Sequence, residues 1–265
     1  MNPSECLIAA KDLFEADKSN SQIGLLSARY PDINMDDAYK IQTLLVKKKI
    51  SAENKVIGWK IGLTSKAMQN ALNIDIPDSG VLLSDMLFQN GDIVPLGRFI
   101  QPRIEAEIAF VIKSDLSGKV SRSDVLSATE YVCPSIEILD TRIVRKDEKT
   151  GASRTVFDTI ADNAANAGIV LGNEKHDPDK FDLSWVGAIV SRNGEIEETG
   201  LGGGVLGDPI LGIAWLSERL GKYGDKISKG AVVLSGSFIR PIECPSGSNI
   251  KADFSNFGMV ELSFE

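Results

Sequence analysis

Histidine and cysteine are scarce in this 265-residue chain, which contains one histidine, His176, and three cysteines. A single histidine excludes a multi-histidine zinc site and the two-histidine facial triad that binds iron. The cysteines lie far apart and form no CxxC pair, which excludes a cysteine-rich zinc site and a disulfide framework. This pattern suits a reducing cytoplasm, and any bound metal is expected to have oxygen ligands.

Long apolar runs and excess positive charge are also missing. No stretch reaches the roughly 20 apolar residues of a membrane-spanning helix, and the first 20 residues lack the apolar core of a secretory signal. The 29 basic and 37 acidic residues give a net charge of −8. Nucleic-acid and polybasic membrane binders need Lys/Arg-rich faces, so neither class of partner is expected.

Apolar spacing predicts helices in the first 50 residues and strands in most of the remainder. Residues 6–14 carry apolar side chains with i, i+3, i+4 spacing, and a second helix is expected from about residue 34 to residue 50. Two later helices are expected at 121–131 and 209–220, and Asn193-Gly194 predicts a hairpin. Many strands without regular alternation with helices favour an α+β fold with a mixed or antiparallel sheet.

The segment Arg103–Ile112 contains two glutamates, Glu105 and Glu107, separated by one residue. Side chains alternate along a strand, so both glutamates and Arg103 are expected on one face. A further carboxylate, Glu137, lies in another apolar run. Adjacent carboxylates in apolar surroundings need a compensating cation, so these three residues are candidate ligands of Mg²⁺ or Mn²⁺. The alternative is an exposed strand face that carries glutamates.

Lys60 lies in the apolar run GWKIG between two glycines. Burial favours the neutral amine, and a nearby metal ion would favour it further, so Lys60 is a candidate acid/base group. The alternative is a surface lysine whose aliphatic stem covers apolar neighbours while its charge reaches water.

Two polar segments are candidate substrate ligands. Asp162 and Asn163 lie among small residues that would allow close approach of a ligand, although aspartate and asparagine also commonly cap helices and form turns. Ser235, Gly236 and Ser237 follow an apolar strand, where hydroxyls and free amides could hold a carboxylate. An ordinary turn between strand and loop is the alternative there.

Two other patterns are not expected to carry chemistry. Residues 202–207 match the spelling GxGxxG, but Pro209 intervenes before the next helix and no convincing apolar strand precedes them, so we expect a flexible loop. His176 lies in the polar segment NEKHDPDK and is expected to be a solvated loop residue. No GxSxG motif accompanies it, which argues against a Ser-His-Asp triad.

Five segments together resemble the hydratase/decarboxylase branch of the fumarylacetoacetate hydrolase superfamily: GWKIGLTSKAMQ, IPDSGVLLSDM, QPRIEAEIAFV, PSIEILDTRI and FDTIADNAANAGIVLG. They occur in the same order and cover nearly the whole chain. The resemblance implies a mixed β-roll catalytic domain at residues 76–265, preceded by a smaller, mainly helical region at residues 1–75. It also implies a homo-oligomer, with decamers among the hydratases.

The resemblance assigns roles to individual residues. It implies that Glu105, Glu107 and Glu137 bind Mg²⁺ or Mn²⁺, that Lys60 lies near the substrate, and that Asp78 of the IPDSG segment is a second catalytic group. The segments KDEKTGASRTVFDTIADNAANAG, NGEIEETGLGGGVLGDP and SGSFIRP are most similar to hydratases of a seven-carbon 2-oxo diacid. The cation for a distal carboxylate is left open among four arginines: Arg142, Arg145, Arg154 and Arg240.

The implied activity is the metal-dependent addition of water to a 2-oxo-enoic diacid in aromatic catabolism. Hydration of 2-keto-4-pentenoate and decarboxylation of 4-oxalocrotonate are alternatives, because the same metal site can hold those 2-oxo acids. Hydrolytic C–C cleavage is less favoured, since it usually enlists a Glu–His pair in this superfamily. A non-catalytic partner subunit is the alternative from another class.

Overall fold

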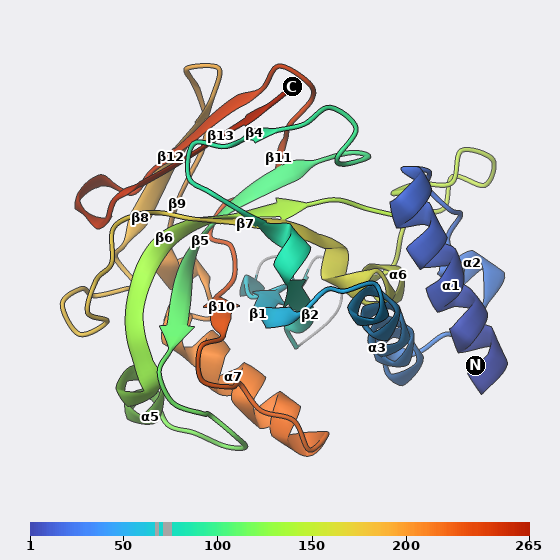
Figure 1. Cartoon of the computed structure of the whole chain (residues 1–265), viewed down its shortest axis with the longest axis horizontal. Helices are drawn as coiled ribbons and strands as arrows, with labels where there is room; N and C mark the ends of the chain where they lie inside the picture. The colour runs from blue at the N-terminus through green and yellow to red at the C-terminus, as the bar shows by residue number, and fades with distance from the viewer. Residues whose placement is uncertain (67–68, 71–75) are drawn as a thin grey trace.

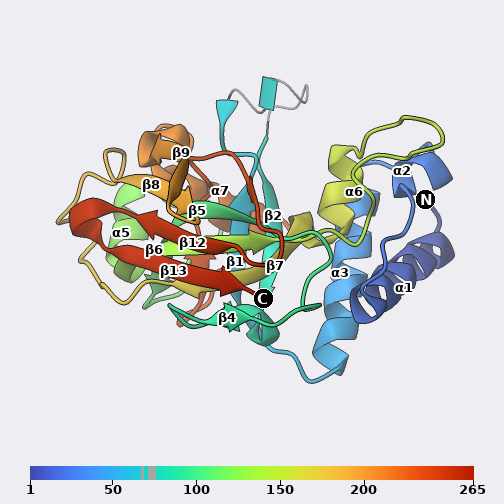
Figure 2. The same cartoon turned by 90° about the horizontal axis from the view of Figure 1, so that it is seen from above.

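The computed structural model describes residues 1–66, 69–70 and 76–265. Helices α1, α2, α3 and α6 gather on one side of two curved sheets, and α7 lies beside the larger sheet (Figures 1 and 2). The helices have these bounds: α1 Pro3–Ser19, α2 Leu26–Arg29, α3 Met35–Ser51, α5 Arg122–Ala128, α6 Val156–Ala161 and α7 Pro209–Lys222.

Side-chain caps explain where the principal helices begin. Asn34 accepts a hydrogen bond from the backbone N–H of Asp37, and the Asp37 side chain accepts one from the backbone N–H of Asn34, which forms a capping box at α3. Asn2 and Glu5 form the same arrangement at α1. These local caps confirm the helix predicted to begin near residue 34.

Within the described residues, the larger sheet has eight strands and the smaller one five. The larger sheet runs β2 (Asp78–Leu83), β1 (Val56–Gly62), β10 (Val232–Leu234), β5 (Arg103–Ile112), β6 (Thr129–Leu139), β7 (Asn166–Leu171) and β3 (Leu87–Phe88), with β11 (Ile242–Glu243) also paired to β5. The smaller sheet runs β4 (Ile93–Val94), β13 (Met259–Phe264), β12 (Asn249–Asp253), β8 (Gly187–Arg192) and β9 (Glu195–Leu201). The pairs β1–β10, β3–β7 and β13–β4 are parallel, so both sheets are mixed as predicted.

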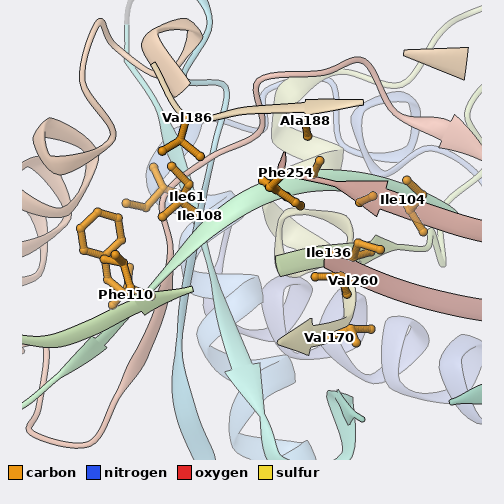
Figure 3. Close-up of a cluster of buried hydrophobic side chains, with 14 of the residues drawn as sticks. Ile61, Ile104, Ile108, Phe110, Ile136, Val170, Val186, Ala188, Phe254 and Val260 are labelled. Carbon is orange, nitrogen blue, oxygen red and sulfur yellow. The ribbon is translucent and has the colours of Figure 1, made fainter. Parts of the chain in front are cut away.

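The main apolar core fills the space between one face of the larger sheet, the smaller sheet and α7. Figure 3 shows part of it, where Ile104 of β5 and Ile136 of β6 lie near Val260 of β13. The even-numbered residues of β5 face this core, so the odd-numbered residues of the same strand face the other way. This alternation places Glu105 and Glu107 on the face of the sheet opposite the main core.

A second apolar core lies among the helices and contains Leu13 of α1, Ile41 of α3 and Ile160 of α6. The segment β1, which precedes residue 75, is hydrogen-bonded into the larger sheet between β2 and β10. The division of the chain near residue 75 stays a prediction.

Local sequence patterns gave most strands, with one boundary error. The strand predicted over 103–112 is confirmed, and Asn193-Gly194 has the positive φ angles of a tight hairpin between β8 and β9. The helix predicted over 121–131 is too long, because α5 ends at Ala128. Thr129 and Tyr131 instead pair with β5, so tertiary pairing decides this boundary.

Two of the predicted loops are more tightly packed than expected. Residues 202–204 form a 3₁₀ turn, and a Cβ atom at Gly202 would lie 2.1 Å from the carbonyl oxygen of Leu183. The predicted loop is present between β9 and α7, with Gly202 tightly packed, and its flexibility stays a prediction. The prediction that His176 is solvated is wrong: its ring is half-buried and stacks on Phe257, because a backbone bridge to Val132 draws it onto the sheet.

Candidate active site

The three predicted metal ligands converge on one face of the antiparallel pair β5–β6. Glu105 lies directly opposite Glu137, and Glu107 is two residues further along β5 on the same face. One carboxylate oxygen from each of the three lies within 4.8 Å of the others. Glu107 and Glu137 are fully buried and Glu105 is half-buried, so the alternative of an exposed glutamate face is wrong.

The carboxylate cluster lacks the hydrogen bonds that buried anions need. Glu107 Oε2 accepts a 2.7 Å hydrogen bond from the backbone N–H of Gly236, but Glu107 Oε1 and both oxygens of Glu137 accept no hydrogen bond from the described residues. Burial, followed by the charge of Glu137, raises the pKa of Glu105 to about 8, and burial also raises the pKa of Glu107 and of Glu137. Unpartnered buried oxygens of this kind fit a divalent cation with oxygen ligands.

Lys60 of β1 is buried beside this cluster, with its Nζ atom 3.4 Å from Glu137 Oε1. The alternative of a surface lysine is therefore wrong. Burial lowers the pKa of Lys60, but the negative charges of Glu137 and Asp78 raise it by more, so the pKa of Lys60 is raised overall. The surrounding carboxylates favour the ammonium form, contrary to the expectation from burial alone. The sequence did not show how many carboxylates surround this side chain.

Asp78 lies on β2, opposite Gly62 of β1, and is also buried. Burial raises the pKa of Asp78, partly offset by the positive charge of Lys60. A Cβ atom at Gly62 would lie 2.3 Å from Asp78 Oδ1 and 3.0 Å from Lys60 Nζ. The missing side chain of Gly62 thus leaves the space that Asp78 Oδ1 and Lys60 Nζ occupy, and the sequence did not predict this role.

Replacing Gly62 by alanine is expected to displace Asp78 and Lys60, because the added methyl group occupies their space. We expect kcat to fall at least about tenfold and the free energy of unfolding to fall by about 1–3 kcal/mol. Gly24→Ala is the matched control, since a Cβ atom there meets nothing within 4 Å. Steady-state kinetics and denaturant unfolding measure both effects, and an unchanged kcat in the Gly62 variant would contradict this account.

The segment Ser235–Ser237 adjoins the cluster through the Gly236 hydrogen bond to Glu107. Gly236 has φ = 118°, and a Cβ atom there would lie 2.5 Å from Thr64 Oγ1, so glycine is required for this close approach. Ser235 Oγ is buried without a partner among the described residues, whereas Ser237 Oγ donates to the carbonyl of Ile239 at 2.9 Å. Ser235 is therefore the hydroxyl of this segment left with free hydrogen-bonding capacity.

Asp162 and Asn163 use their polar atoms inside the protein. Asp162 accepts hydrogen bonds from Arg142 through both carboxylate oxygens, at 2.6 Å from Nε and 2.8 Å from the backbone N–H. Asn163 pairs with the backbone of Val81, accepting at 2.8 Å and donating at 2.9 Å, and so ties β2 to the turn after α6. Their assignment as substrate ligands stays a prediction.

Comparison with known proteins places the chain in a family. No protein-family model matches it. It is 45% identical over 258 residues to the 2-oxo-hept-4-ene-1,7-dioate hydratase of Escherichia coli, with 97% of each chain covered. It is 37% identical over 266 residues to the 2-keto-4-pentenoate hydratase of Paraburkholderia xenovorans strain LB400, with 100% of this chain and 97% of the relative covered.

A solved structure of 4-oxalocrotonate decarboxylase from Pseudomonas putida G7, complexed with magnesium and adipate, superposes with a TM-score of 0.93 at 29% identity. It covers 100% of this chain and 99% of the decarboxylase. The chain belongs to the hydratase/decarboxylase branch of the fumarylacetoacetate hydrolase superfamily. The predicted family and fold are thereby confirmed. None of the described helices is long and apolar enough to cross a membrane.

The raised carboxylate pKa values give the cluster a pH-dependent cost without metal. Between the ordinary carboxylate pKa and about 8, the folded state holds more protons at Glu105 than the unfolded state does, so this site destabilises the fold as pH rises through that range. A bound divalent cation removes this cost. The increase in Tm on adding Mg²⁺ is therefore expected to be larger at about pH 9 than at about pH 6. Thermal unfolding with Mg²⁺ or chelator checks this, and an equal increase at both pH values would contradict it.

Proposed function

We propose that this chain is a Mg²⁺-dependent hydratase that converts 2-oxohept-4-ene-1,7-dioate to 4-hydroxy-2-oxoheptanedioate. The observation that carries the proposal is the convergence of three buried carboxylates with Lys60 and Asp78 in a chain 45% identical to a hydratase of that substrate. The solved decarboxylase, which is complexed with magnesium, supports the choice of metal.

Glu105, Glu107 and Glu137 would hold the metal ion. Three carboxylates leave about three of six octahedral positions for other oxygen ligands. When bound there, Mg²⁺ or Mn²⁺ supplies Lewis-acid stabilisation of the enolate form of a 2-oxo acid. The unpartnered oxygens of Glu107 and Glu137 are the structural feature that fits this ion.

The other residues bind the substrate and move protons. The backbone and hydroxyl of Ser235–Ser237 would hold the carboxylate next to the 2-oxo group. The 2-oxo-4-ene first enolises: C3 loses a proton and the 2-oxo oxygen gains one, which gives the 2,4-dienol. Ketonisation of the dienol then transfers a proton from the 2-hydroxyl group to C5 and leaves a C3=C4 double bond. Water then adds at C4 while C3 gains a proton. Lys60, beside the metal ligands, would donate the proton, and Asp78, which is buried opposite Gly62, would accept the proton from water.

The experiment that tests this function uses purified protein, Mg²⁺ and enzymatically prepared 2-hydroxyhepta-2,4-diene-1,7-dioate, with 2-hydroxypenta-2,4-dienoate in parallel. Loss of the dienol absorbance is followed and the products are identified by mass. Gain of one water by the seven-carbon diacid, abolished by chelator, supports the proposal. Turnover of the five-carbon acid alone would instead indicate a 2-keto-4-pentenoate hydratase.

Decarboxylation is the second candidate, since the chain is 30% identical over 265 residues to the 4-oxalocrotonate decarboxylase of Pseudomonas putida. Release of CO₂ from an oxo-enedioate would indicate this activity. C–C hydrolysis is disfavoured because the chain's one histidine, His176, is bonded through Nε2 to the carbonyl of Phe257. A non-catalytic subunit is disfavoured because all three candidate metal ligands are present together.

We also propose that the protein works in the cytoplasm as a homo-oligomer, as the family resemblance implies. Support comes from large apolar side chains that are exposed near and along β8 and β9, among them Trp185 and Ile196, which are 74% and 68% exposed. Light scattering after size-exclusion chromatography tests the assembly. A monomer at micromolar concentration would contradict it, and a mass near ten subunits would support the decamer.

A further inference from the structure

The proposed substrate carries two carboxylates, and the described site offers it little positive charge. Glu105, Glu107, Glu137 and Asp78 surround the single cation Lys60. Even with a divalent metal, this set sums to −1 when all groups are ionised. A second substrate carboxylate would therefore need its own cations. The following inference rests on the proposed function and concerns which residues supply them.

Arg103 is the nearest such cation along the sequence of β5. It lies two residues before Glu105, so strand alternation places both side chains on the same face, with Cα atoms about 6.6 Å apart. Arg103 is half-buried, its Nε atom is fully buried, and it makes no hydrogen bond or ion pair within the described ranges. Its cross-strand neighbour Glu243 pairs instead with Arg145.

Arg154 approaches the same region from the segment between β6 and α6. Its backbone N–H donates to the carbonyl of Arg145 at 2.9 Å, and its Nη1 donates to Thr141 Oγ1 at 2.6 Å. It forms no ion pair with a carboxylate among residues 1–66, 69–70 and 76–265. Burial lowers the pKa of Arg154, the charge of Asp162 opposes this, and neighbouring arginines, Arg103 among them, lower it further. The hydrogen bond to Thr141 places Arg154 just past the end of β6, where Leu139 lies opposite Arg103.

Other arginines in the region already have partners. Arg142 is bound to Asp162, and Arg240 is 82% exposed in its side chain and pairs with Glu198. Arg145 pairs with Glu243. Arg219 stacks on Tyr39, with its Cζ atom 3.7 Å from the ring centroid, and lines a separate groove between α3 and α7. Arg103 and Arg154 are left as the half-buried arginines of this region that form no ion pair within the described residues.

We propose that Arg103 and Arg154 bind the distal carboxylate of a dicarboxylic substrate and set the preference for diacids over monoacids. The guanidinium groups can donate paired hydrogen bonds to a carboxylate, which would satisfy the buried Nε atom of Arg103. The metal and the Ser235–Ser237 segment would bind the proximal carboxylate and the 2-oxo group. Arg103 was noted from the sequence only as a cation in phase with Glu105.

The test compares binding of adipate and hexanoate, a diacid and a monoacid of equal carbon number, to the Mg²⁺-loaded protein by calorimetry. The variants are Arg103→Met and Arg154→Met, with the surface variant Arg240→Met as control. We expect each site variant to weaken adipate binding on the order of 30–100-fold and hexanoate binding less than about threefold. Arg154→Lys should recover part of the loss, and Mn²⁺ affinity should be retained in all variants.

Three results would overturn the inference. Equal losses for adipate and hexanoate would place the arginines at the proximal carboxylate, and no loss for either ligand would remove them from the site. Loss of diacid preference in Arg219→Met alone would move the distal subsite to the groove beside α7. These readouts involve no chemical step, so they separate failure of this inference from failure of the proposed hydratase activity. The kcat/KM ratio for the seven-carbon and five-carbon dienols then reports the same preference during turnover.

Discussion

Replacing Lys60 by methionine is expected to lower kcat by about 10²–10⁴-fold while the protein still binds its metal. Lys60 is buried with Nζ 3.4 Å from Glu137, and it is the ammonium closest to the carboxylate cluster among the described residues. Methionine keeps much of the side-chain volume but cannot hold a proton. Loss of the lysine also removes a positive charge that competes with the metal ion, so the affinity for Mn²⁺ should stay equal or increase.

Lys55→Met is the matched control, because Lys55 is exposed just before the same strand. Stopped-flow measurement of dienol loss, together with Mn²⁺ titration, separates the chemical step from metal binding. A Lys60 variant that retains wild-type kcat would refute the acid/base role. A variant that loses Mn²⁺ binding as well would show that Lys60 acts by holding the ligands in place.

Replacing Glu137 by glutamine is expected to weaken Mn²⁺ or Mg²⁺ binding by at least about 100-fold and to abolish turnover at ordinary metal concentrations. Glutamine has nearly the same shape but removes one of three anionic ligands. The stability effect has the opposite sign. Without metal, Glu137 is a buried carboxylate that accepts no hydrogen bond, and its ion-pair partner Lys60 keeps three other carboxylates nearby in the variant. The variant should therefore unfold at an equal or higher temperature than the metal-free wild type.

Glu130→Gln is the control on the same strand, where the side chain is exposed. Thermal unfolding with and without Mg²⁺ should show a metal-dependent increase in Tm for the wild type and the control, and none for the Glu137 variant. If the Glu137 variant keeps the metal-dependent increase, the ion is held elsewhere.

The shared face of two candidate metal ligands could be predicted from the sequence because strand periodicity is local. Once Arg103–Ile112 is recognised as a strand, Glu105 and Glu107 must share a face, and the apolar residues that alternate with them must face the core. The register that sets Glu137 opposite Glu105 is not local, since it depends on how β5 and β6 pair. The family resemblance supplied that contact before the structure did.

The protonation state of Lys60 and the proposed site for the distal carboxylate could not be predicted from strand periodicity. The protonation preference of Lys60 depends on four carboxylates from three strands, which no window of sequence displays. Arg142 and Arg154 look alike as isolated arginines. Only the fold shows that Arg142 is bound to Asp162, whereas Arg154 forms no ion pair in the described chain. Helix and strand boundaries, by contrast, were missed by only a few residues.

The packing of His176 has a practical consequence for following this protein in solution. Its ring lies 4.7 Å from those of both Phe181 and Phe257, and Nε2 is hydrogen-bonded to the Phe257 carbonyl at 2.9 Å. Since the chain has no other histidine, an NMR spectrum of the imidazole protons contains a single residue's signals, shifted by two aromatic ring currents. These resonances report whether the smaller sheet is folded. They need no label, and they come from a residue away from the candidate metal-binding face.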